Sequence, residues 1–445
     1  MQPMQASLLG MRLDGRGCVW HSRPPFSRWQ RDMNQDIDGF AAWMRLAAAL
    51  LIGTLGGVGM WSVVVVLPAV QAEFAVDRGA ASLPYSLTMI GYAVGSVFMG
   101  RWTDRVGVFR PVVAGALALG LGYVAAGFAR NLIEFALAQA VLIAAIGSSP
   151  LFGPLMADVS WWFRRYRGFA LSVCATGNYF AGTLWPPVIN YFMQAHGWRA
   201  TQIGMGIFLM IVMLPLAFLF RRPAPAQDAP IVTTVVTSAP QRDLTRPFGL
   251  SPNMAQVLIA FAGVACCVAM SMPQVHIVAY CSDLGYGVAR GAEMLSLMMG
   301  FGIVSRLASG YISDKIGGLN TLLIGSFLQG VALALYVIFD GLNSLYVVSA
   351  LFGLFQGGIV PSYAMIVREY FPAKEAGTRV SIALTATMIG MALGGWLNGV
   401  IFDWTNSYDM AFLNGLAWNF LNLTIAVFLL LRVSGGTTRL RPAPA

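Results

Sequence analysis

Residues 100–107 read GRWTDRVG and residues 310–317 read GYISDKIG, so the pattern G-x-x-x-D-[RK]-x-G occurs twice, 210 residues apart. The shared positions are Gly100, Asp104, Arg105 and Gly107 in the first segment and Gly310, Asp314, Lys315 and Gly317 in the second. A further match aligns WFRRYRGFALS, which begins at residue 162, with YFPAKEAGTRVS, which begins at residue 370. Two matches in the same order and at nearly the same offset indicate a duplicated unit.

Both copies lie in a very hydrophobic chain. Of its 445 residues, 57% are hydrophobic and 11% are charged, whereas soluble domains carry about 25% charged residues. The charges collect in short gaps between long apolar stretches, which in lipid must be helices that make their own backbone hydrogen bonds. We therefore predict an all-α integral membrane protein with twelve transmembrane helices in two six-helix bundles. The predicted spans lie near residues 47–70, 83–100, 111–129, 132–156, 168–193, 201–220, 254–280, 294–312, 321–339, 345–367, 380–402 and 411–431.

One long break interrupts the hydrophobic pattern. It opens RRPAPAQDAP at residue 221, and Pro-rich stretches of this kind behave as extended linkers. The predicted division is a tail at 1–45, a bundle at 46–220, a linker at 221–252, a second bundle at 253–432 and a tail at 433–445.

The basic residues are distributed unevenly between the two predicted sides of the membrane. With the N-terminus inside, 23 of the 28 lie in cytoplasmic segments and four lie in outer loops, namely Arg78, Arg130, Arg199 and Arg290. This bias follows the positive-inside rule. It places both termini in the cytoplasm and explains the net charge of +9 without a nucleic-acid partner. A bacterial inner membrane is the expected location.

Motifs for other function classes are missing from the sequence. The cysteines (Cys18, Cys174, Cys266, Cys267 and Cys281) form neither a CxxC pair nor zinc spacing, so we expect no metal and no cofactor. No G-x-x-x-x-G-K-[ST] loop is present to bind nucleotide phosphates, which argues against an ATP-driven pump. H-E-x-x-H and G-x-S-x-G are also absent, so we do not expect an enzyme.

The repeated loop resembles the signature of the major facilitator superfamily, which carries this motif after span two and a weaker copy after span eight. The resemblance covers roughly residues 46–432. It implies two six-helix bundles around a central cavity that opens alternately to each side. The loop is then interpreted as a latch between conformations, and the alternative is a simple loop whose charges set the topology.

Two segments resemble the monocarboxylate transporter and oxalate/formate antiporter branch: WWFRRYRGFALSVCATGNYFAGTLWPP at the entry to span five and GFGIVSRLASGYISDKIG in span eight. The resemblance implies that Arg306 binds a carboxylate. Departures from the family pattern are also present. Gly302 stands where the mammalian branch has an aspartate, and neither 47–70 nor 380–402 contains a lysine. The resemblance therefore does not imply a particular substrate or coupling ion for this protein.

Glu134, His276 and Arg306 are the ionisable residues inside the predicted spans. At about 1.5 Å per residue, Arg306 lies roughly 18 Å deep and Glu134 about 3 Å deep, so the two cannot pair. A buried guanidinium costs about 3 kcal/mol to insert. Arg306 is therefore expected to bind an anionic substrate, and its alternative role is to reach Asp314 as part of the latch.

Five further polar residues within spans are candidates for the substrate site. His276 could couple a proton through titration near pH 6.5 or could be a packing residue. Uncharged side chains in spans can contact a ligand or form interhelical hydrogen bonds. The uncharged candidates are Asn178, Gln274, Gln356 and Tyr363.

These observations predict a secondary active transporter for a small organic anion, with a monocarboxylate favoured. It would work by alternating access, through proton symport or anion exchange, as a monomer in membrane lipid. The alternative is an efflux pump of the same superfamily for drugs or other small molecules. Span five reads GNYFAGTLWPP, which does not match the glycine–proline motif of such pumps.

Overall fold

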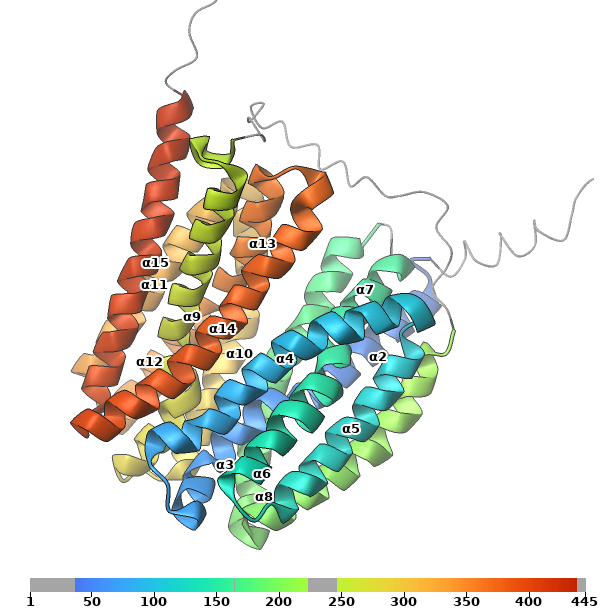
Figure 1. The fold of residues 1–445 in the computed structure, drawn as a ribbon, viewed down its shortest axis with the longest axis vertical. Coiled ribbons are helices and arrows are strands. Elements are labelled where there is room, and N and C mark those ends of the chain that lie inside the picture. The colour runs from blue at the N-terminus through green and yellow to red at the C-terminus, as the bar shows by residue number, and fades with distance from the viewer. Residues whose placement is uncertain (1–36, 164, 223–245, 438–445) are drawn as a thin grey trace, which may run out of the picture.

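The computed structural model describes residues 37–163, 165–222 and 246–437, and the regular structure in these ranges is helical (Figure 1). Most of the predicted N-terminal tail, most of the linker and residues 438–445 lie outside the described residues. The prediction of an all-α membrane protein is confirmed.

The first half of the described chain holds spans one to six. Its helices are α2 (Phe40–Gly56), α3 (Val58–Phe74), α4 (Arg78–Val106), α5 (Phe109–Phe128), α6 (Leu132–Leu137), η1 (Ala138–Ser148), η2 (Ser149–Leu151), α7 (Gly153–Trp162), α8 (Arg167–Ala217) and η3 (Phe218–Phe220).

The second half repeats this order after a short turn, η4 (Pro247–Gly249). Its helices are α9 (Pro252–Asp283), α10 (Val288–Ile316), α11 (Gly318–Ile338), α12 (Leu342–Gln356), α13 (Ile359–Tyr370), α14 (Ala373–Thr405) and α15 (Tyr408–Thr437). Helices α4 and α10 are both 29 residues long and begin 210 residues apart. The spacing of the sequence repeat is thus also the spacing of the helices.

In the described part of the chain, ten helices are long and apolar enough to cross a membrane. One of them, 169–220, contains two spans, because Gly197 at φ +78° breaks its helical backbone. Helix α4 is long enough but contains more polar residues, and it supplies the remaining span. These segments correspond to the twelve predicted spans.

Several helix ends lie outside the predicted spans. Helix α10 begins at Val288 rather than near 294, because polar residues continue a helix beyond its apolar part. At the N-terminus, α2 begins at Phe40, inside the expected tail. There the backbone N–H of Asp38 donates to the carbonyl of Trp162 at 3.0 Å. The first bundle therefore starts before residue 46.

The repeated motif ends in a tight turn in both halves. Gly107 between α4 and α5 has φ +79°, and Gly317 between α10 and α11 has φ +84°. Residues with a Cβ adopt this region only at a cost. The last motif position is therefore glycine because the backbone there adopts a positive φ angle.

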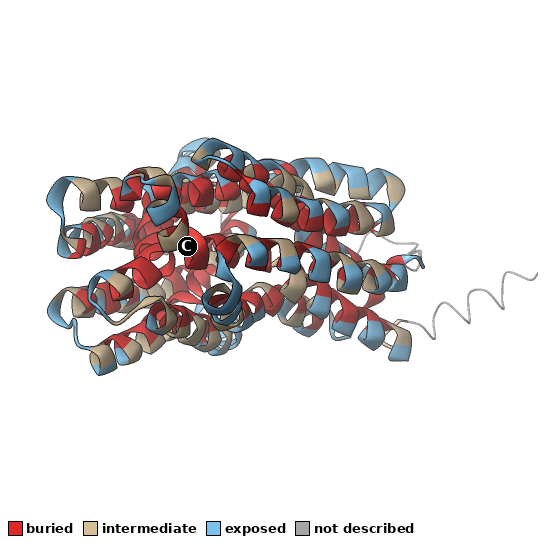
Figure 2. Cartoon of the chain, turned by 90° about the horizontal axis from the view of Figure 1, so that it is seen from below, coloured by how far each residue is buried: buried red, intermediate tan, exposed pale blue. Residues whose placement is uncertain are grey.

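The two halves form two bundles side by side (Figure 1). We call the end that carries Arg222 and Arg246, where the linker departs, the linker end, and the opposite end the loop end. The ribbons of the bundles lie close together toward the loop end and diverge toward the linker end (Figure 1). Within each bundle the buried residues gather on the faces that helices turn toward one another (Figure 2).

Candidate substrate site and bundle interface

Arg306 lies in the middle of α10, half-buried, on the side that meets α8 of the other bundle. Its guanidinium carbon lies 5.2 Å from the centroid of the Tyr179 ring. Among the described residues no carboxylate pairs with it, so its charge is not neutralised. The alternative contact with Asp314 is not formed.

Tyr179 and its neighbour Asn178 reach the interface from α8. A Cβ added at Gly302 would lie 2.4 Å from Cε1 of Tyr179, so the ring occupies the space next to Gly302. The indole N–H of Trp61 donates to the carbonyl of Asn178 at 3.1 Å and to its Oδ1 at 3.3 Å. The side chain of Asn178 thus bonds to Trp61 within the first bundle, one residue along the chain from the ring that contacts the cation.

Gln274 and Gln356 form a buried pair behind α10. The amide of Gln274 donates to Oε1 of Gln356 at 2.5 Å, and Nε2 of Gln356 has no partner. The next residue, Gly357, packs so closely on α10 that an added Cβ would lie 2.5 Å from the carbonyl of Gly302. This pair therefore lies beside the helical turn that leads to Arg306.

His276 and Tyr363 do not share this position. The ring of His276 is fully buried, and its Nε2 lies 2.9 Å from the carbonyl of Gly395. The hydroxyl of Tyr363 donates to Oδ1 of Asn422 at 2.9 Å, and Asn422 donates to Ser326 at 2.8 Å. Both residues form interhelical hydrogen bonds, while Nδ1 of His276 is buried without a hydrogen-bond partner among the described residues.

Glu134 is exposed at the start of α6. Its backbone N–H donates to the side chain of Asn131 at 2.9 Å, and its carboxylate accepts from the backbone N–H of Arg130 at 2.8 Å. This pattern resembles a capping box, with the N–H of the residue before the N-cap in place of the N-cap N–H. Glu134 therefore caps the start of α6 rather than placing a charge deep within the membrane.

The loop end contains a charge cluster between the bundles that the sequence did not reveal. Nη2 of Arg78 donates to Asp283 at 2.8 Å. Asp403 accepts from the backbone N–H groups of Arg78 at 2.8 Å and Gly79 at 2.6 Å, so a residue of α14 caps α4. A carboxylate there is favoured by the positive end of the helix dipole. These partners are 205 to 325 residues apart, and no local pattern links them.

Two further hydrogen bonds join the bundles: Ser86 donates to the carbonyl of Ala392 at 2.6 Å, and Ser296 donates to the carbonyl of Thr183. These two hydrogen bonds and the charge cluster thus lie between the loop end and the middle of the helices. At the linker end, Asp104 and Asp314 are exposed and form no ion pair with a described residue. This conformation is held together at the loop end.

Another buried pair lies at the linker end of the first bundle. Arg45 donates to Asp158 through Nε at 2.6 Å and Nη2 at 2.8 Å, with side chains 3% and 7% exposed. Nη1 of Arg45 also donates to the carbonyls of Leu219 at 3.3 Å and Arg222 at 2.9 Å. This arginine, expected in the tail, therefore connects the first, fourth and sixth spans.

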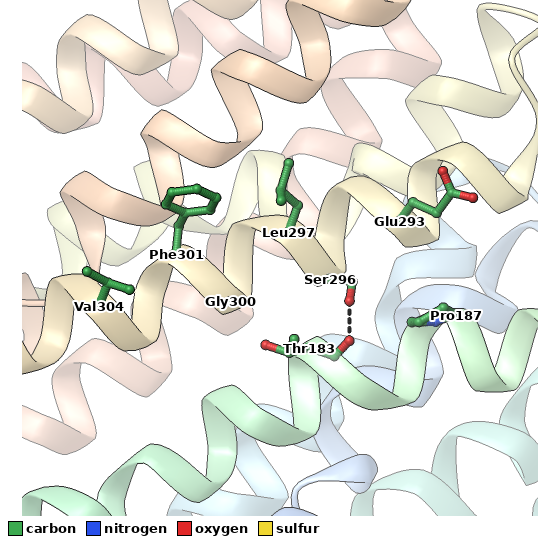
Figure 3. Close-up of a pocket in the computed structure, with 8 residues that line it drawn as sticks. All are labelled: Thr183, Pro187, Glu293, Ser296, Leu297, Gly300, Phe301 and Val304. Atoms are coloured by element: carbon green, nitrogen blue, oxygen red, sulfur yellow. Dashed lines mark hydrogen bonds between the residues drawn. The ribbon is translucent and has the colours of Figure 1, made fainter.

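A groove of about 400 Å³ lies along α8 and α10 (Figure 3). It is lined by Thr183, Pro187, Glu293, Ser296, Leu297, Gly300, Phe301 and Val304. At about 100° per residue, Val304 and Arg306 point to opposite sides of α10. The groove is therefore separate from the cation.

Comparisons with known proteins agree with this architecture. The family model described as Major Facilitator Superfamily matches residues 49–344 and 321–445. Monocarboxylate transporter 13 of Bos taurus is 26% identical over 387 residues, which is 84% of this chain and 86% of that protein. The agnestins efflux protein AgnL12 of Paecilomyces divaricatus is 23% identical over 335 residues, 75% of this chain and 73% of that protein.

Among solved structures, a bacterial homolog of the human lysosomal transporter Spinster in an inward-facing, unoccupied conformation superposes with a TM-score of 0.69. The identity is 15%, and the match covers 91% of this chain and 99% of that one. At this identity the likeness concerns the fold.

Proposed function

This chain belongs to the major facilitator superfamily, and we propose that it is a secondary transporter for small organic anions, of which monocarboxylates fit best. The observation that carries the proposal is Arg306. Its guanidinium lies at the bundle interface without a carboxylate partner among the described residues. A guanidinium can bind both oxygens of one carboxylate through parallel hydrogen bonds. The relationship to monocarboxylate transporter 13 supports the same substrate class.

The contacts between the bundles support alternating access around this arginine. The cluster of Arg78, Asp283 and Asp403 holds the loop end closed. Asp104 and Asp314 remain free to engage when the linker end closes and the loop end opens. In this proposal the two motif loops form the latch of the opposite conformation, and the linker end faces the cytoplasm of a bacterial cell.

The charge of the site favours anion exchange over proton symport. Apart from Tyr179, no titratable side chain of the described residues forms an ion pair or a ring contact with Arg306. An empty site carries an unpaired cation, which is costly in the membrane, whereas a bound monocarboxylate neutralises it. The loaded protein should therefore change conformation more readily than the empty one.

Uptake of a radiolabelled panel of formate, acetate, pyruvate and lactate into proteoliposomes tests the proposal. Arg306→Ala should weaken carboxylate affinity by about 100-fold or more, because two charge-assisted hydrogen bonds of about 1.5–3 kcal/mol each are lost. Arg306→Lys should recover part of the affinity, since an ammonium is a point charge. Arg432→Ala, at the exposed end of α15, is the matched control. Unchanged affinity in Arg306→Ala would refute the proposal.

A second candidate function is efflux of less polar molecules. The groove along α8 and α10 favours it, because this groove is separate from the cation and largely lined by apolar side chains (Figure 3). The relative named as an efflux protein is consistent with it. Bulky substitution at Gly300 should then impair transport of the substrate, while Arg306→Ala should not.

A further inference from the structure

Tyr179 contacts two residues of the opposite bundle that lie one helical turn apart. Its ring lies beneath the guanidinium of Arg306 at 5.2 Å, and the same ring lies against the backbone of Gly302. Residues four apart on a helix share a face. Gly302 and Arg306 therefore both face the ring: Gly302 leaves space for it, and Arg306 places its cation against it.

Gly302 is a spatial requirement for this arrangement. A Cβ there would lie 2.4 Å from Cε1 and 2.7 Å from Cδ1 of Tyr179. Such distances are far shorter than normal carbon contacts of about 3.5–4.0 Å. The contacting atoms belong to a rigid ring, so any side chain at position 302 would displace it from the guanidinium.

An aromatic ring and a carboxylate affect a guanidinium differently. Both attract it, but a carboxylate neutralises the charge and occupies the hydrogen-bonding edges, whereas a ring attracts through its face and leaves these edges free. A cation held by a ring is thus fixed in place and still available to an incoming anion.

We propose that Tyr179 is the positioning residue of the anion site: its ring, admitted by Gly302, holds the Arg306 guanidinium with its edges free for a carboxylate. The inference rests on the proposed function and adds a specific division of roles. Arg306 binds the substrate, Tyr179 orients Arg306 across the bundle interface, and Gly302 provides space for the ring.

The test uses the full chain in proteoliposomes, with the monocarboxylate of the panel that the parent protein transports fastest. Tyr179→Phe keeps the ring and should leave KM within about twofold of the parent value. Tyr179→Leu removes the ring and should raise KM about tenfold, with a smaller change in kcat. Gly302→Ala should raise KM similarly, because it displaces the ring.

The double variant Gly302→Ala with Tyr179→Leu gives the sharpest result. If position 302 acts through the ring, adding Gly302→Ala to Tyr179→Leu should change KM by less than about twofold. Additive effects of the two substitutions would overturn the inference, and so would an unchanged KM in Tyr179→Leu or an equal loss in Tyr179→Phe. Unchanged carboxylate affinity in Arg306→Ala would refute the proposed function itself. If Arg306→Ala loses affinity but Tyr179→Leu keeps it, the proposed function stands and only the positioning role of Tyr179 is refuted.

A second readout needs no transported substrate. Phenylglyoxal modifies arginine side chains, and peptide mass spectrometry can measure its rate at Arg306. We expect labelling about threefold faster in Tyr179→Leu than in the parent protein and Tyr179→Phe, because the guanidinium leaves the ring. Equal labelling rates in all three proteins would contradict the positioning role.

Discussion

Arg45, which is buried, and Arg306, which is half-buried, have opposite surroundings. Arg45 is fully satisfied by the carboxylate of Asp158 and two backbone carbonyls. Arg306 contacts the side chain of Tyr179 and has no carboxylate partner among the described residues. An arginine with all its partners inside the protein contributes to the fold, whereas one that lacks an anion is available for a ligand. The sequence identified Arg306 because it stands alone in an apolar span, but the pairing of Arg45 with a residue 113 positions away left no local signal.

Breaking the Arg45–Asp158 pair should destabilise the first bundle. Asp158→Ala should lower the free energy of unfolding by about 3–5 kcal/mol, because it leaves a buried charge uncompensated. Replacing both residues, as Arg45→Met with Asp158→Leu, should recover most of the loss. Thermal unfolding in detergent measures both, with Arg290→Ala, which removes an exposed ion pair, as a control expected to unfold like the parent. A double variant no more stable than Asp158→Ala would contradict this account.

At the scale of elements, the hydropathy of the sequence predicted the helices, but it did not predict where they end or break. Charged residues near helix ends look like loop residues in a sequence, although several here continue or cap a helix. Asp403 near the end of α14 caps α4 of the other bundle, and Glu134 caps the start of α6. The motif glycines Gly107 and Gly317 were identified from the repeated motif, and their positive φ angles explain why both positions are glycine.

The motif loop after α4 gives the prediction at this scale. Asp104→Asn should reduce transport severalfold while leaving thermal stability unchanged. In the conformation described, its carboxylate has no ion pair with a described residue, so its loss affects only the state in which the linker end is closed. Transport assays and thermal unfolding on the same preparation measure both effects. Asp340→Asn, on the exposed turn before α12, is the control, and unchanged transport in Asp104→Asn would exclude a latch.

At the scale of the whole molecule, the sequence duplication predicted both bundles. The offset of 210 residues between the motif copies is also the offset between the first residues of α4 and α10, which are equally long. The interface between the bundles was not predictable in the same way. Its residues are far apart in the chain, and which of them meet depends on the conformation. Tyr179 lies within the segment at the entry to span five that resembles monocarboxylate transporters. Only its contacts with Gly302 and Arg306 distinguish it from other aromatic residues.

The missing counter-charge at Arg306 has an electrical consequence. If Arg306 binds the substrate as proposed, an empty site should cross the membrane field as a cation, whereas a site loaded with a monocarboxylate should cross it as a neutral pair. The work of moving one charge is at most about 2.3 kcal/mol per 100 mV. With a potassium gradient and valinomycin to set the membrane potential, net uptake into empty vesicles should change severalfold per 100 mV. Exchange of labelled for unlabelled monocarboxylate should stay constant, and voltage-dependent exchange would contradict a neutral loaded state. The arginine that recognises the anion would thereby also make the return of the empty protein the only step that senses voltage.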